Sequence, residues 1–146
     1  MLHLVKLSVG TRDVPGLLRW QAGAGRGHDG LPRHVTRMWP KREAELLAGG
    51  SIFWVIKRAV LCRQRILRLE EHRGADGVPR CALVLDPEVV RVTPVPKKAF
   101  QGWRYLPAAE APRDLGAWRE GDDELPPKLS MALAEMGVVW SGPGRG

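Results

Sequence analysis

Residues 33 to 42, "RHVTRMWPKR", hold the densest grouping of side chains that could do chemistry. The stretch carries four Lys/Arg residues, His34 and Trp39, and it has no carboxylate. Cations bind a polyanion by neutralising its phosphates and releasing counterions, and flat rings stack on unpaired bases. The composition therefore predicts a binding surface for RNA or a nucleotide-like anion. A solvated basic strip with no such partner is the alternative.

Similar basic and aromatic residues recur in "FWVIKR" and in "KKAFQGWRY". Arg63 and Arg65 flank Gln64 on a probable strand, which would place the two guanidiniums on one face about 7 Å apart. They could bind adjacent phosphates, or pair with Glu70, Glu71 or the acidic segment downstream. Trp54, in an apolar strand, is expected in the core. The residues predicted to contact nucleic acid are Arg33, His34, Arg37, Trp39, Lys41, Lys57, Arg58, Arg63, Arg65, Trp103 and Arg104.

No catalytic residue, metal site or cofactor motif is predicted. The four histidines lack the spacing of a zinc site, and His34 is expected to stay neutral as a structural or hydrogen-bonding residue. The stretch "GAGRGHDG" matches no nucleotide-binding glycine motif and is expected to be a flexible surface loop. Cys62 and Cys81 are expected to be small core residues in strands.

Charge is distributed unevenly along the chain, whose formal net charge is +7. Residues 31–68 contain nine Lys/Arg against two acids, whereas residues 107–125 contain six acids against two Arg. Such asymmetry is typical of a polyanion-binding face, and the acidic segment could instead neutralise that face. No apolar run is long enough to span a membrane, so a cytoplasmic protein is expected.

Strands that dominate the middle of the chain would position these residues. Asp13 should cap a helix over 14–22. Pro40 should begin a helix over 40–50 with Ala44, Leu47 and Ala48 on one face and Leu46 beside them. The 60–72 strand should bulge near Ile66. We expect one α+β, strand-dominated domain over 1–146, a small and mostly antiparallel β-barrel with short peripheral helices. The remaining elements are an extended stretch at 34–39, strands at 2–9, 51–58, 79–86, 89–95 and 100–106, an acidic Pro-rich excursion at 107–127, a helix at 126–137 and a frayed tail at 141–146.

Three stretches, "RHVTRMWPKREAELLAGGSIFWVIKR", "RQRIL" and "FQGWRYL", resemble a bacterial family of conserved hypothetical proteins known as a domain of unknown function. More distantly, the helix ending "AELLAGG" and the strand ending Lys57-Arg58 are similar to the ASCH/EVE branch of the PUA-like superfamily. That resemblance implies a small β-barrel whose cleft binds RNA or a modified nucleobase.

The sequence departs from this branch at the residues used by its amidohydrolases. Those enzymes use a Lys and a Thr just after the helix-ending Gly, whereas residues 49–53 here read "GGSIF". An RNA- or modified-nucleotide-binding module is therefore the leading prediction. A nucleotide or amide hydrolase would instead have a buried Lys, Glu or His with a shifted pKa in the cleft. A module that docks an acidic protein would expose an apolar patch beside the arginines. The sequence leaves the oligomeric state open.

Overall fold

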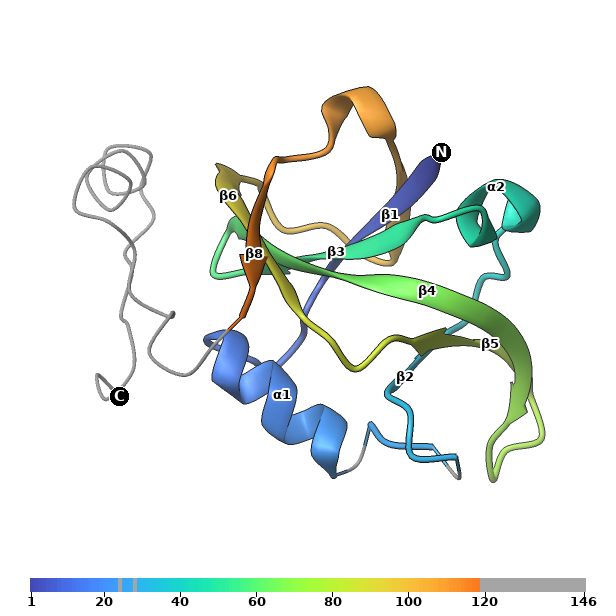
Figure 1. Cartoon of the computed structure of the whole chain (residues 1–146). Coiled ribbons are helices and arrows are strands. Elements are labelled where there is room, and N and C mark those ends of the chain that lie inside the picture. The colour runs from blue at the N-terminus through green and yellow to red at the C-terminus, as the bar shows by residue number, and fades with distance from the viewer. Residues whose placement is uncertain (24, 28, 119–146) are drawn as a thin grey trace.

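A computed structural model describes residues 1–23, 25–27 and 29–118, which form one mixed sheet with short helices around it (Figure 1). The expected α+β, strand-dominated fold is confirmed. In chain order the elements are β1 (Leu2–Leu7), α1 (Val14–Ala22), β2 (Arg33–Thr36), α2 (Glu43–Leu47), β3 (Ser51–Ile56), β4 (Ala59–Arg73), β5 (Pro79–Leu85), β6 (Val90–Pro96), β7 (Trp103–Pro107), the 3₁₀ turn η1 (Ala108–Glu110) and β8 (Asp114–Ala117).

The long strand β4 organises the sheet. Its first half pairs with β3 on one side and β6 on the other, and its second half pairs with β5. The register shifts between Ile66 and Arg68, which confirms the predicted bulge. The sheet order is β2-β5-β4-β3-β1-β7, with β6 and β8 branching from β4. Only β1 and β3 pair in parallel among the described strands.

The sheet curls until its two edges, β2 and β7, approach each other. The indole nitrogen of Trp103 donates to the carbonyl of Met38 at 3.2 Å, and the backbone nitrogen of Arg42 donates to the Tyr105 hydroxyl at 3.1 Å. These contacts are made by side chains, and no backbone ladder joins β2 to β7 in the described part of the chain. The described sheet is therefore open, without the backbone closure that a β-barrel requires.

Hydrophobic residues fill both faces of the sheet because strand side chains alternate. The larger, inner core contains Leu4, Ile52 and Trp54, and α1 packs against it through Val14 and Leu17. The outer core contains Val5, Phe53, Val55, Val60 and Val92, covered in part by Phe100, Leu106 and Ala111. Trp54, Cys62 and Cys81 are buried as predicted.

Helix α1 begins as the sequence predicts, with the Asp13 carboxylate accepting from the Gly16 amide at 2.8 Å. It is fixed to the sheet by a buried pair of amides, because Gln21 and Gln64 donate to each other at 2.7 and 2.9 Å. The Trp54 indole also donates to Gln64, at 2.9 Å. Gln64 therefore points into the inner core, away from Arg63 and Arg65.

Helix α2 is shorter than the predicted 40–50 helix. It begins at Glu43, after Arg42, whose backbone is not helical (φ −96°, ψ 44°) and whose amide donates to the distant Tyr105 hydroxyl. Its buried residue is Leu46, whereas Ala44 and Ala48 are exposed, so the expected apolar face was wrong.

The expected excursion at 107–127 is partly described, and in that part it forms η1 and the exposed edge strand β8. The predicted helix at 126–137 and the tail at 141–146 lie outside the described residues.

Candidate functional site: the seam pocket

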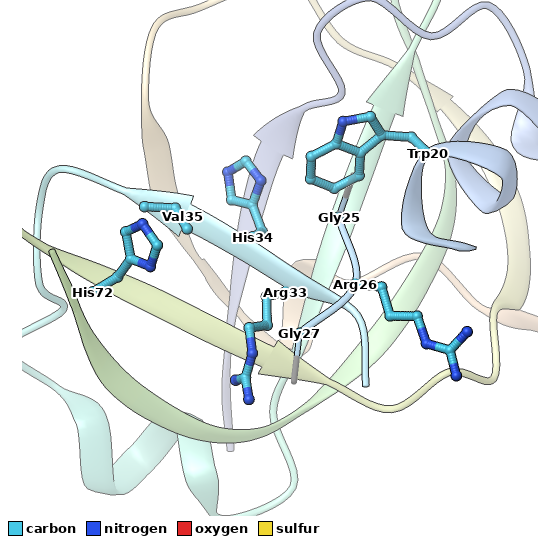
Figure 2. A pocket seen from close by; sticks show the side chains of 8 residues that line it. All are labelled: Trp20, Gly25, Arg26, Gly27, Arg33, His34, Val35 and His72. Atoms are coloured by element: carbon cyan, nitrogen blue, oxygen red, sulfur yellow. The ribbon is translucent and has the colours of Figure 1, made fainter. Parts of the chain in front are cut away.

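Two cavities lie where α1 and the 25–27 loop meet β2, and they share Trp20 and His34 as walls. We call them together the seam pocket. One measures about 390 Å³, within the size range of small-molecule sites, and Figure 2 shows its lining. The other measures about 170 Å³. The first is lined by Trp20, Gly25, Arg26, Gly27, Arg33, His34, Val35 and His72, and the second by Ser8, Val9, Thr11, Leu17, Trp20, His34 and Trp54.

The glycines of "GAGRGHDG" let this loop pack closely on its neighbours. A Cβ at Gly25 would lie 2.3 Å from the Trp20 ring, and one at Gly27 would lie 1.9 Å from Nε of Arg33. The Gly25 carbonyl also accepts from the Arg33 amide at 2.7 Å. The described residues of this loop are therefore a shaped wall of the pocket, which the sequence interpretation of a flexible surface loop did not anticipate.

His34 is the most perturbed polar side chain of the pocket. Its ring meets the Trp54 ring edge-on, with centroids 5.2 Å apart, and its Nε2 is buried with no hydrogen-bond partner. Burial, assisted by the charge of Lys6, lowers the pKa of His34 to about 4. The imidazole is therefore neutral near pH 7, and its buried Nε2 has no hydrogen-bond partner.

Lys6 lies between two tryptophans on the sheet. It is in register with Trp54 on β3 and with Trp103 on β7, and neighbours in one such row project from the same face. Burial lowers the pKa of the Lys6 ammonium. The row therefore places a partly desolvated cation close to His34.

Two of the predicted basic and aromatic stretches contact each other. Segment 37–42 contacts β7 through the Met38–Trp103 and Arg42–Tyr105 hydrogen bonds, and the Arg42 guanidinium lies 5.6 Å from the Tyr105 ring centre. Arg37, Trp39 and Lys41 are exposed along this segment. The Trp39 indole donates to Glu43 on α2 at 2.9 Å.

Other predicted residues are bound to carboxylates of the protein itself. Arg33 pairs with Asp29 and Glu70 at 2.9 and 3.0 Å, and its side chain is only 11% exposed. Arg63 donates to both oxygens of Asp114 in β8, at 2.8 and 2.6 Å, and to the Ser51 hydroxyl at 3.0 Å. For Arg63 the alternative of pairing with the acidic segment is therefore the one observed.

The remaining predicted residues lie away from the pocket. Lys57 and Arg58 form the β3–β4 turn, and Arg104 lies 4.7 Å from the ring centre of Phe100. Arg65 is exposed on β4, two residues beyond Arg63.

Sequence reasoning missed three side chains that line the pocket, Trp20, Arg26 and His72. It also missed Lys6, whose charge acts on His34. Alternate glycines at 25 and 27 between a helix and a strand were the available signal, because such spacing suits a backbone pressed against large side chains.

The described residues hold no group of three or more His, Cys, Asp or Glu placed to bind a metal ion. None of the helices in the described ranges is long and apolar enough to cross a membrane.

The chain belongs to a family described as "Protein of unknown function (DUF1489)", whose sequence pattern matches residues 4–139. This confirms the resemblance to a domain of unknown function. No curated protein and no solved structure matches the chain.

Proposed function

We propose that the protein binds RNA, or a nucleotide derived from it, by holding one base in the seam pocket. The observation that supports this most strongly is the pair of walls shared by the two cavities. One is Trp20, whose side chain is 42% exposed, and the other is His34, whose Nε2 has no partner.

Each wall would make a different contact with the base. Stacking on an aromatic ring contributes about 1–3 kcal/mol per base. A buried polar atom without a partner is costly, so a base edge that supplies the missing hydrogen bond to His34 would be favoured. Figure 2 shows the two rings on the same side of β2, with the Arg33 side chain pointing the other way.

Cations around the pocket would hold the phosphates. Arg26 lines the larger cavity, and Arg37 and Lys41 are exposed on segment 37–42. Within the described ranges these three form no ion pair with a carboxylate, unlike Arg33. They are therefore better suited to phosphate than Arg33 or Arg63.

The test is fluorescence anisotropy with short single-stranded RNA at several salt concentrations. We expect Trp20→Leu to weaken binding about 10- to 100-fold, the equivalent of one lost stacking contact. Trp39→Leu is the matched control, because its side chain is 43% exposed but lies outside the two cavities.

Equal effects of the two substitutions would contradict base binding in the pocket. Titrations of the wild-type protein that stay flat at low salt would overturn RNA binding altogether.

A nucleotide or amide hydrolase is the second candidate, favoured by the lowered pKa values of His34 and Lys6 at the seam. Product formation from nucleotides, lost in His34→Gln, would support it over simple binding. Docking of an acidic protein has some support from Val35, Met38 and Trp39, which are exposed beside Arg37.

A further inference from the structure

We propose that the β3–β4 turn and the segment before β7 form a second phosphate-binding surface, which extends the RNA site beyond the pocket. We call it the tip surface; it comprises Lys57, Arg58, Lys97, Lys98, Phe100 and Arg104. This inference rests on the proposed function. It assigns the tip surface to the sugar-phosphate backbone of a strand whose base occupies the pocket.

Backbone geometry brings the two segments together. Lys57 and Arg58 are the two central residues of a hairpin turn, and the Lys97 amide donates to the Arg58 carbonyl at 2.8 Å. Ala59 also pairs with Pro96 across β4 and β6. Cations forty residues apart in the sequence are thus adjacent.

Phe100 anchors the cations beside it. Its ring packs against the outer core, and its face is approached by Arg104 at 4.7 Å and Lys97 at 5.9 Å. Contact with an aromatic face orients a cation while leaving its hydrogen-bond donors free for phosphate oxygens.

The tip surface also differs in its pairing from the six arginines of the described ranges that form ion pairs with carboxylates. Arg33, Arg63, Arg68 and Arg80 are bound to the protein's own carboxylates. No ion pair to a carboxylate is formed by Arg58, Lys98 or Arg104 in the part of the chain that the structure describes. Their charge therefore remains available to an external anion.

The turn has an unfavourable backbone conformation for its residue types. Lys57 and Arg58 have φ values of 51° and 66°, in the left-handed region that two-residue hairpins usually fill with Asn-Gly. Non-glycine residues there are strained, and strain of this kind is often found at binding sites. Two cations held in this conformation are consistent with a contact that compensates for its cost.

The tip surface follows the end of β3, and residues just after the parallel strand β1 line the smaller cavity. Because β1 and β3 are parallel, both end on the same side of the sheet, and the Ser8 amide donates to the Val55 carbonyl at 2.9 Å. Ser8 and Val9 line the smaller cavity, whereas Lys57 follows β3 directly. A strand leaving the pocket toward this end would meet the tip surface.

The test compares a mononucleotide with a 12-nucleotide single-stranded RNA, using Arg58→Ala/Lys98→Ala. We expect the double variant to bind the 12-mer more weakly and to reduce the slope of log affinity against log salt by about 1.4, or roughly 0.7 for each lost contact on single-stranded RNA. Its affinity for the mononucleotide should be unchanged. The matched control, Arg73→Ala/Arg80→Ala, removes two cations from the β4–β5 hairpin at the other end of β4 and should leave the 12-mer slope as it is.

A second variant separates a loss of binding from a loss of folding stability. Lys57→Asn/Arg58→Gly installs the residues that this turn prefers, so it should raise the melting midpoint and still weaken binding to the 12-mer. The inference is overturned if the Arg58→Ala/Lys98→Ala variant binds the 12-mer like wild type, or loses mononucleotide binding to the same extent. Failure of the proposed function would look different, because wild type would then bind neither ligand.

Discussion

Gln64 has all the hydrogen bonds that its buried amide can make. Its oxygen accepts from Gln21 and Trp54, and its nitrogen donates to Gln21 and to the Asp86 carbonyl at 3.1 Å. Because no polar atom of this side chain is left unsatisfied, burying it carries little desolvation penalty. Strand alternation with Arg63 and Arg65 predicted its inward orientation, but its partner on α1 is 43 residues away and could not be read from the sequence.

His34 makes the stability of the protein depend on pH. Its pKa in the folded protein is about 4, below the ordinary 6.5, so the unfolded chain takes up a proton first as the pH falls. Its neutral form therefore stabilises the fold fully above pH 6.5, and this contribution is lost progressively between pH 6.5 and 4. The loss should reach about 3 kcal/mol at most. Urea unfolding at pH 7.5 and pH 4.5 measures it.

The control for this prediction is His34→Phe, which keeps an aromatic ring beside Trp54 and removes the titrating group. Its free energy of unfolding should fall less than that of wild type over the same pH interval. His72→Gln should behave like wild type, because His72 is exposed. Identical pH profiles for His34→Phe and wild type would refute the assignment to His34.

At the scale of elements, Gly50 sets how closely α2 and β3 approach β1. A Cβ there would lie 2.1 Å from the Leu2 carbonyl oxygen and 2.5 Å from that of Leu46, both of which are backbone atoms. Gly50→Ala should therefore lower the free energy of unfolding by about 3 kcal/mol. Gly23→Ala is the control, because its nearest neighbour would be at 3.7 Å, and it should change stability by less than about 1 kcal/mol. Urea midpoints that match for the two variants would show that the backbone can relax around Gly50.

The elements that were predicted well are those with local signals. The Asp13 cap and the bulge after Ile66 each depend on neighbouring residues. Helix α2 was predicted too long because the backbone at Arg42 is not helical, although Pro40 suggested an earlier start. The Arg42 amide donates instead to Tyr105, which is 63 residues away and has no local signature in the sequence.

At the scale of the whole molecule, the acidic segment is attached to the sheet through charge. Asp114 binds the Arg63 guanidinium, which holds β8 beside β6. Asp114→Asn should loosen β8 locally and raise amide exchange at Thr93 and Trp118, whose amides bond to Arg113 and Val89. The increase should be up to about fivefold, since exposed pairs contribute about 0.2–1 kcal/mol. Amides of β3 should not change, and equal acceleration throughout the sheet would instead indicate global destabilisation.

For the candidate site, the sequence drew attention to basic and aromatic residue types. It did not give their positions in the structure. Segment 37–42 contacts β7 through the Met38–Trp103 and Arg42–Tyr105 hydrogen bonds. The pocket itself depends on Trp20 and on the loop at 25–27, where the relevant signal is close packing rather than charge. Sequence also could not show that Arg33 pairs with Glu70 and Arg63 with Asp114, because these carboxylates are distant in the chain.

The side-chain contacts between β7 and segment 37–42, which follows β2, have a consequence for changes in the length of this segment. In a backbone ladder, inserting or deleting one residue reverses which side chains face inward along the rest of a strand. Segment 37–42 meets β7 through an indole and a hydroxyl instead, so its length can change without altering the alternation of either strand. Small insertions in this segment should therefore leave the sheet and both cores intact.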